Sequence, residues 1–295
     1  MTIGTGNSIL ASDYNTIQTN VANVLGVGSG NTGYGQSVSS AQVAVGNTIT
    51  ASQMQNLKTD LDKIAYHQNN AASTAPSVVA GGSITASDWS TYSSQATSLS
   101  GTRFTLSTSQ ATAIDGVAPT MTGWNSARTH TVTVTFASAN DARYFFNAGG
   151  EIRVIPSISG QTSTKGNAWN SIFTTVGTAK FGYAATTAGA GGTSIGWYNL
   201  TSSNQTILTY TSSGLTYTNN IFSIQAYCNV ANNSTGTASV LTLTITYNDA
   251  GNYYTGLNTT DENVDGTTTS RVQHYRATGS YVQVLAPTIT GSVIA

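Results

Sequence analysis

The sequence predicts a mainly β protein with a small α-helical module at its N-terminus. From residue 102 on, apolar residues alternate with Thr, Ser or Gln, which is the pattern of half-buried β-strands. We therefore expect a helical domain at 1–101 and an antiparallel β-sandwich or jelly-roll-like domain at 102–295. The helical expectation rests on a phrase that recurs as GNSILASDYNTIQTNV (6–21), GNTITASQMQNLKTDL (46–61) and GGSITASDWSTYSSQA (81–96).

The second copy of the phrase shows how each helix is expected to begin. Thr50 is the expected N-cap, and Gln53 completes a capping box with it. Ile49 and Met54 flank the cap as the apolar pair of a hydrophobic staple. The third copy fills the same positions with Ile84, Thr85, Asp88 and Trp89.

The first copy departs from this pattern at the cap. Leu10 occupies the place of the capping Thr, although Ile9 and Tyr14 keep the apolar pair. Because leucine has no side-chain acceptor, we expect Ser8 or Ser12 to cap this helix instead.

Apolar residues after each cap recur at helical spacing and form one stripe on each helix. The stripes are Tyr14, Ile17, Val21, Val24 and Leu25, then Met54, Leu57, Leu61, Ile64 and Ala65, then Trp89, Tyr92, Ala96 and Leu99. A solenoid is an alternative, but such short helices supply only a small core. We expect the helices to dock on the following domain or on neighbouring copies of the chain. The residues assigned to this assembly role are Ile9, Tyr14, Ile17, Val21, Ile49, Met54, Leu57, Leu61, Ile84, Trp89 and Tyr92.

The second domain contains alternating segments separated by Gly and Asn turns. The expected strands are HTVTVTFAS (130–138), EIRVIPSIS (151–159), IFSIQAYCNV (221–230), SVLTLTITYND (239–249) and SYVQVLAPTI (280–289). Two inserted helices are expected at SANDARYFFNAGG (138–150) and KGNAWNSIFTTVG (165–177). Their aromatic residues are expected to cover one end of the sheets.

Composition limits the classes of partner. Charged residues make up 7% of the chain and the formal net charge is −1, against about 25% charged residues in average domains. Nucleic acid and anionic lipid are disfavoured as ligands, because binding phosphate requires clustered Lys and Arg. No signal peptide is expected, and no apolar run is long enough for a membrane span. Cys228 lies in an apolar run and is expected to be buried and inert.

No residue pattern predicts catalysis. The chain has no nucleophile elbow, phosphate loop or dinucleotide fingerprint. His67, His130 and His274 lie apart in sequence and are expected to be surface or strand residues. Asp141 and Glu151 are considered as a catalytic carboxylate pair, but their separation in the sequence does not show whether they meet in the fold. We therefore expect a non-enzymatic protein without a cofactor.

Two ligand sites are weaker alternatives. Asp261, Asn263 and Asp265, followed by Gly266, fit the first half of a calcium loop, but Val272 stands where a bidentate Glu is required. A solvated acidic turn is the favoured interpretation of this segment. Aromatic side chains stack on sugar rings, so a carbohydrate-binding module is a further alternative. Its candidate residues are Trp124, Trp169, Trp197 and the Tyr-rich stretch NYYTG (252–256).

Several phrases also resemble those of a known family. SANDARYFFNAGGEIRV, KGNAWNSIFTTVGTAKFG, DGTTTS and ATGSYVQVLAPTITGS resemble stretches of virion structural proteins from contractile-tailed marine bacteriophages, especially cyanophages. GYGQSVSSAQVAVGNTITASQMQNLKTDLDKI is similar to a module at the front of such proteins. The resemblance covers most of the chain and contains no catalytic signature.

This resemblance implies a component of the virion, in the tail, baseplate, collar or fibre, assembled in the host cytoplasm. The implied partners are other virion proteins and copies of the same chain in a homo-oligomer. A host surface glycan is the alternative ligand if the chain forms a fibre tip.

Overall fold

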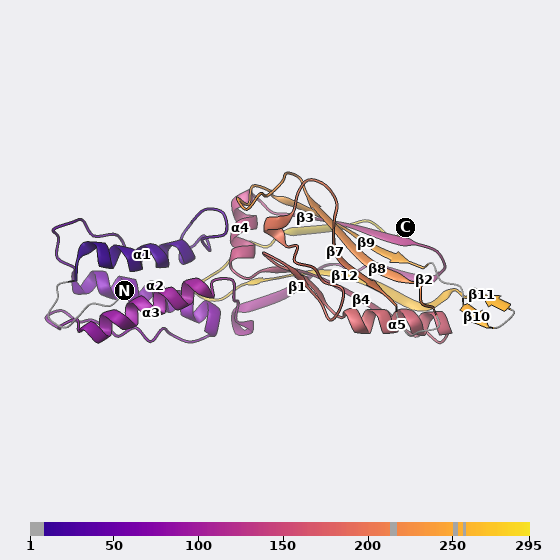
Figure 1. Cartoon of the computed structure of the whole chain (residues 1–295), viewed down its shortest axis with the longest axis horizontal. Helices are drawn as coiled ribbons and strands as arrows, with labels where there is room; N and C mark the ends of the chain where they lie inside the picture. Colours follow the sequence, from indigo (N-terminus) through magenta and orange to yellow (C-terminus); the bar gives the residue numbers. More distant parts are fainter. Residues whose placement is uncertain (1–8, 213–216, 250–252, 256–257) are drawn as a thin grey trace. The chain divides into compact units, whose positions relative to one another are not determined.

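The computed structural model describes residues 9–212, 217–249, 253–255 and 258–295. The expected fold class is confirmed, because the described strands form two antiparallel sheets and the helices lie mostly in the N-terminal part (Figure 1). The chain divides into two compact units. The helical unit comprises Met1–Thr112, Arg143–Gly150 and Arg276–Leu285, and the β unit comprises the remainder.

The unit boundaries differ from the predicted division at residue 101. The helical unit also takes in Arg143–Gly150 and Arg276–Leu285, two segments that sequence order assigns to the β domain. A hydrogen-bond network explains the first of them. The Arg143 guanidinium and the Asn147 amide donate to backbone carbonyls of the Gly-rich segment 27–33. These bonds satisfy carbonyls that the irregular loop leaves without partners in regular secondary structure.

The helical unit is built from α1 (Ala11–Leu25), α2 (Ala51–Asn69) and α3 (Ala86–Gly101). The helices run parallel. Near their starts, the Tyr14 hydroxyl donates to the Gln53 carbonyl and the Tyr92 hydroxyl donates to the Met54 carbonyl. Near the ends of α2 and α3, the Gln68 amide donates to the Leu99 carbonyl. Parallel helices require long returns, which residues 26–50 and 70–85 supply (Figure 1).

A carboxylate and an amide side chain hold the first of these returns, residues 26–50, against α1 and α2. Asp60 on α2 is fully buried and accepts from the backbone N–H groups of Ser39 and Ser40. Asn15 on α1 both donates to and accepts from the backbone of Val43, in the way that a neighbouring strand would. The chain between the helices is therefore fixed by the helices themselves.

The β unit contains two sheets and a short hairpin. The first sheet has the order β1-β12-β4-β5-β6, with β2 also paired to β12, and the second has the order β13-β3-β9-β8-β7. The strands of the first sheet are β1 (Ala111–Val117), β2 (Thr120–Trp124), β4 (Glu151–Ser159), β5 (Ala179–Phe181), β6 (Thr186–Thr187) and β12 (Val264–Ala277). Those of the second are β3 (Arg128–Thr135), β7 (Gln205–Thr211), β8 (Ile221–Cys228), β9 (Val240–Asn248) and β13 (Thr288–Gly291). The hairpin is β10 (Tyr253–Thr255) with β11 (Asn258–Thr260), and short 3₁₀ turns lie at Thr108–Gln110 and Trp197–Asn199.

Aromatic side chains fill the core of the β unit. Trp124 from the first sheet lies 5.0 Å from the ring of Trp169 and 6.2 Å from that of Tyr247 in the second sheet. Trp169 belongs to α5 (Thr164–Val176), which Ser163 caps, and Phe173 on the same helix contacts Phe222 of β8. The expectation that the second inserted helix covers the sheets is thus met by α5. The first, α4 (Ala139–Asn147), differs, because its residues from Arg143 on belong to the helical unit.

The strands expected at 130–138, 151–159, 221–230 and 239–249 are present as β3, β4, β8 and β9. The strand expected at 280–289 is wrong, since only Thr288–Gly291 forms a strand. The alternation there is real, because Val282 and Val284 are buried. However, this segment packs within the helical unit, where Gln36 donates to the Gln283 carbonyl, and it does not join a sheet.

Candidate functional site

The helical unit is the first candidate, because its repeated phrase predicts an assembly role. The predicted caps of α2 and α3 are present. The N–H of Gln53 donates to Thr50 Oγ1 over 3.3 Å, and the N–H of Asp88 donates to Thr85 Oγ1 over 3.1 Å. Each capping residue's own N–H donates back to the Gln53 or Asp88 side chain. The capping boxes therefore fix two of the three helix starts.

The start of α1 corrects the prediction. Leu10 is the N-cap and its N–H donates to the Asp13 carboxylate over 3.0 Å, so one half of the capping box remains. Ser12 lies inside the helix and does not cap it, and Ser8 lies outside the described residues. Asp13 and Asp88, each three positions after the N-cap, are thus the feature that the first and third copies share.

The apolar stripes face one another inside the helical unit. Positions four, seven, eleven and fourteen after each N-cap are at most 4% exposed in all three helices. Spacings of three and four are those of a coiled-coil seam, in which parallel helices present equivalent residues at one level. Grouped by equivalent position, the buried residues are Tyr14, Met54 and Trp89; Ile17, Leu57 and Tyr92; Val21, Leu61 and Ala96; Val24, Ile64 and Leu99. One chain therefore supplies three packed helices whose buried residues have the spacing of a coiled-coil seam.

This packing corrects the assignment of the stripes to docking. A side chain with no exposed surface has none to offer to another protein. Eight of the assigned residues are core residues of the unit, namely Tyr14, Ile17, Val21, Met54, Leu57, Leu61, Trp89 and Tyr92. Ile9, Ile49 and Ile84 are half-buried beside the caps. The sequence showed the amphipathic faces correctly but not that they cover each other.

Exposed apolar side chains lie elsewhere on this unit, close to the helix starts. Leu10 is 59% exposed, Val45 93% and Val79 69%. Val45 and Val79 belong to tight turns that precede α2 and α3, in which the N–H of Asn47 or Gly82 bonds the carbonyl three residues earlier. The third position of each turn is Gly46 or Gly81, with φ of +89° and +80°. Such φ values favour glycine, which explains why the repeated phrase begins with it.

The outer face of α1 is polar. Ser12, Asn15, Thr16, Thr19 and Asn20 line a shallow pocket of about 300 Å³. No charged group lines this pocket, so it offers hydrogen bonds without a titratable residue.

The acidic loop that leads into β12, for which calcium is the weaker alternative, bonds other parts of the protein. Asp261 pairs with the Lys165 ammonium over 2.5 Å. Asp265 accepts from the N–H and hydroxyl groups of Thr162 and Ser163, which hold the pKa of its carboxyl at about 2 against the opposing effect of burial. The backbone carbonyl of Asn263 accepts from Ser163. Within the described residues no set of three His, Cys, Asp or Glu side chains is arranged for a metal. The carboxylates instead tie this loop to the start of α5.

The tryptophans assigned to sugar stacking are buried, which corrects that assignment. Trp124 is 2% exposed and donates from Nε1 to Thr268 Oγ1, and Trp197 is 0% exposed with its ring 5.8 Å from that of Phe136. Trp169 is also fully buried. The side chains of NYYTG (252–256) lie outside the described residues.

An aromatic pair with one exposed ring lies in the described part of the helical unit. Tyr281 is 47% exposed, and its ring centroid lies 5.3 Å from that of Tyr66 on α2. Sequence reasoning missed this pair because the two residues are far apart in the chain and Tyr281 was assigned to a strand.

No family model, curated protein or solved structure matches this chain significantly. Among the described helices, none combines the length and apolarity needed to cross a membrane.

The two carboxylates considered as a catalytic pair both bond other residues of the protein. Asp141 accepts from Ser138 at the start of α4, and Glu151 pairs with Arg153 over 2.7 Å. Cys228 is buried as predicted, and burial raises the pKa of its thiol to about 12. The thiol therefore stays protonated and unreactive near neutral pH.

The histidines are buried, which corrects the expectation that some lie at the surface. His67 on α2 is 1% exposed, His130 on β3 is 0% and His274 on β12 is 5%. Burial lowers the pKa of both His67 and His130 to about 4. Near neutral pH both therefore occupy their sites as neutral rings.

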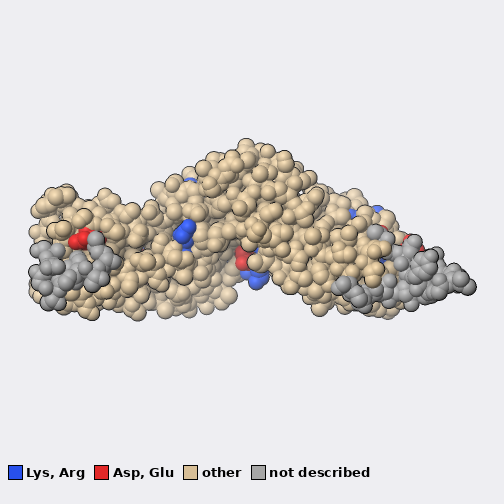
Figure 2. Space-filling view, viewed as in Figure 1, with Lys and Arg blue, Asp and Glu red and all other residues tan. Residues whose placement is uncertain are grey.

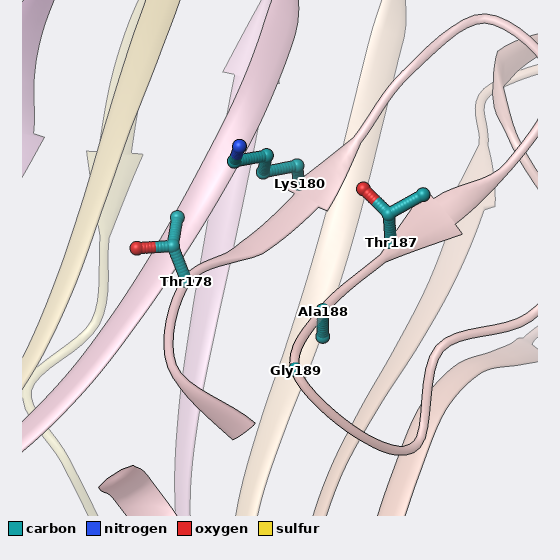
Figure 3. A pocket seen from close by; sticks show the side chains of 5 residues that line it. All are labelled: Thr178, Lys180, Thr187, Ala188 and Gly189. Atoms are coloured by element: carbon teal, nitrogen blue, oxygen red, sulfur yellow. The ribbon is translucent and has the colours of Figure 1, made fainter. Parts of the chain in front are cut away.

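A second shallow pocket lies beside the hairpin of β5 and β6. It measures about 340 Å³ and is lined by Thr178, Lys180, Thr187, Ala188 and Gly189 (Figure 3). Lys180 is the single charged residue of the lining, and no aromatic ring belongs to it. This lining lacks both the paired groups of acid–base catalysis and a platform for a sugar ring.

The surface is poor in charge. Figure 2 shows one face on which Lys, Arg, Asp and Glu appear only at a few separate places. This follows from a sequence with 10 Lys and Arg and 11 Asp and Glu among 295 residues. Hydroxyl and amide groups provide the remaining polarity, which favours contacts that depend weakly on salt.

Proposed function

We propose that this chain is a non-enzymatic structural protein of a bacteriophage particle, located in the tail, baseplate, collar or fibre. The helical unit attaches it to the particle, and the β unit is displayed. The observation that carries the proposal is the repeated capped helix, which gives the chain an α-helical unit distinct from its β unit. The phrases that resemble virion proteins support the same role.

Because the apolar stripes are buried inside the helical unit, the proposed attachment surface lies on the outside of this unit. Leu10, Val45 and Val79 expose apolar side chains close to the helix starts. Exposed apolar side chains favour burial against another protein, and the low charge removes long-range repulsion between subunits. The proposed occupant is a neighbouring protein of the same virion.

Particles of the virus that encodes this chain provide the test. We expect mass spectrometry of purified particles to detect the polypeptide, and cryo-electron microscopy to place it in the tail or an appendage, with the helical unit at the contact. A genome encoding Leu10→Asp, Val45→Asp and Val79→Asp together is expected to yield particles that lack the protein. A Val293→Asp genome is the control, because Val293 is 79% exposed in the β unit. Purified wild-type particles without the polypeptide would refute the structural role.

Recognition of a host glycan is a second candidate function, and the Tyr66–Tyr281 pair favours it. Exposed aromatic rings stack on the apolar faces of sugars, and Tyr281 is the exposed ring of this pair. The Gln36 amide beside it donates to the Gln283 carbonyl. We expect Tyr281→Ala to weaken binding of host polysaccharide about tenfold, as measured by titration calorimetry. Tyr281→Phe keeps the ring and is expected to bind like the wild type. Equal affinity of the Ala variant would exclude stacking on this pair.

A further inference from the structure

A buried lysine lies between two carboxylates in the β unit. Lys165 is 1% exposed, and its Nζ is 2.8 Å from Asp249 Oδ2 and 2.5 Å from Asp261 Oδ1. The Asp249 side chain has no exposed surface, whereas that of Asp261 is 46% exposed. These residues come from the start of α5, the end of β9 and the segment before β12, so the fold alone brings them together.

A buried aromatic ring lies beside this cluster. The ring of Tyr217, itself fully buried, lies 5.2 Å from Lys165 Nζ. Within the described part of the chain, Asp249 Oδ1 is buried without a hydrogen-bond partner.

We propose that Lys165 Nζ and Asp249 Cγ join in an intramolecular amide bond with loss of one water molecule, and that Asp261 carries the proton for this step. Each of the groups required is in place. The nucleophile and the acceptor are in direct contact and both buried, and the proton carrier contacts the nucleophile from the solvent side. The reaction goes beyond the proposed structural role and does not depend on it.

The step balances without an external reagent. A proton first passes from the Lys165 ammonium to the Asp249 carboxylate along their hydrogen bond, leaving a neutral amine and a neutral carboxylic acid. The amine lone pair then attacks Asp249 Cγ, and the Nζ–Cγ bond forms. Asp261 takes one proton from Nζ and returns it to the departing hydroxyl group, which leaves as water when the C–O bond breaks. One ammonium and one carboxylate thereby become one amide and one water molecule.

Two physical effects favour the reaction at this site. Fixing the two groups in contact makes the step unimolecular, which lowers the barrier that amide formation has in dilute solution. Burial, taken alone, lowers the pKa of the Lys165 ammonium and so favours the neutral amine that attacks. Against this, the two aspartates raise the pKa of Lys165 and stabilise an unlinked ion pair. The ion pair is therefore the competing state that an experiment has to distinguish from the amide.

Mass spectrometry of the full chain distinguishes the two states. We expect the denatured wild-type protein to be lighter than its sequence by one water molecule. Trypsin does not cleave after an acylated lysine, so peptide 154–180 is expected to remain intact and joined to peptide 181–271. Fragmentation of this joined species is expected to place the link on Asp249, not on Asp261. The peptide map does not depend on processing of the N-terminus.

Matched variants test the roles of the residues. Lys165→Arg keeps the positive charge and the hydrogen-bond donors but forms no amide, and its expected mass is that of its full sequence. Asp261→Asn keeps the shape and removes the proton carrier, so we expect it to be unlinked. A linked Asp261→Asn protein overturns the role of Asp261, and a link on Asp261 overturns the choice of acceptor. Wild-type protein of full sequence mass, cleaved normally after Lys165, overturns the proposal, and this result needs no variant to fold.

Discussion

Trp89→Ala is expected to lower the free energy of unfolding of the helical unit by about 3–5 kcal/mol. Trp89 is fully buried in the core of the helical unit, as are Tyr14 and Met54 at the equivalent positions of α1 and α2. Removing the indole leaves a cavity that two neighbouring helices, each fixed by its own packing, fill only in part. Urea unfolding followed by helical circular dichroism at neutral pH measures the loss, and hydrogen exchange of α1 to α3 assigns it to this unit.

Leu10→Ala is the matched control, because Leu10 is an apolar residue of the same unit that is 59% exposed. Its effect on stability is expected to stay within about 0.5 kcal/mol. If Trp89→Ala kept the stability of the wild type and lost only assembly, the stripes would be docking surfaces after all, and the packed seam would be refuted.

Acidification is expected to destabilise both units through His67 and His130. Their pKa is about 4 in the folded chain, against an ordinary value of 6.5. Between these values the unfolded chain binds more protons than the folded one, so stability falls as the pH falls. The contribution is fully present above about pH 6.5 and decreases until about pH 4. From pH 7.5 to pH 5 the loss is expected to be about 2 kcal/mol for each histidine.

Urea unfolding at a series of pH values tests this expectation. His67→Leu cannot be protonated, so it is expected to flatten the pH dependence of the helical unit and leave that of the β unit unchanged. His130→Leu is expected to do the reverse. Asp265 does not contribute in this range, because its pKa of about 2 moves its own transition to lower pH. An unchanged slope in both variants would assign the effect to other groups.

Local signals in the sequence predicted the helices and the central strands well. The cap residues Thr50 and Thr85 are recognised from sequence because a capping box involves only residues three positions apart. Likewise, β8 and β9 alternate strictly between buried and half-buried residues. Such signals depend on each segment alone.

The strand β12 shows why other parts were missed. It spans Val264–Ala277 and pairs with β4 over nine positions, yet its sequence VDGTTTSRVQHYRA has no sustained apolar alternation. Its buried face carries Thr268, Ser270 and Val272, so polar residues are accommodated there by partners on other strands. Trp124 Nε1 donates to Thr268, and His130 bonds Ser270. Those partners lie more than a hundred residues away in sequence, where pattern reading does not reach.

The candidate sites failed for the same reason. Asp261 and Asp265 have the spacing of a calcium loop, but in the fold they bond Lys165 and Ser163. These partners are about a hundred residues away in the sequence, so the local pattern does not predict them. The stripe residues of the three helices were identified correctly as a set. What these residues contact depends on the parallel arrangement of the helices. The long connections permit that arrangement, but their sequences do not predict it.

The single-chain seam has a consequence for symmetry. An assembly of three identical chains must repeat one residue at equivalent positions of its helices, whereas here the equivalent positions hold Val21, Leu61 and Ala96. The three sides of the bundle are therefore free to diverge, and a neighbouring protein can distinguish them. Such a bundle can be fixed in one rotational orientation, and its folding does not depend on the concentration of the chain.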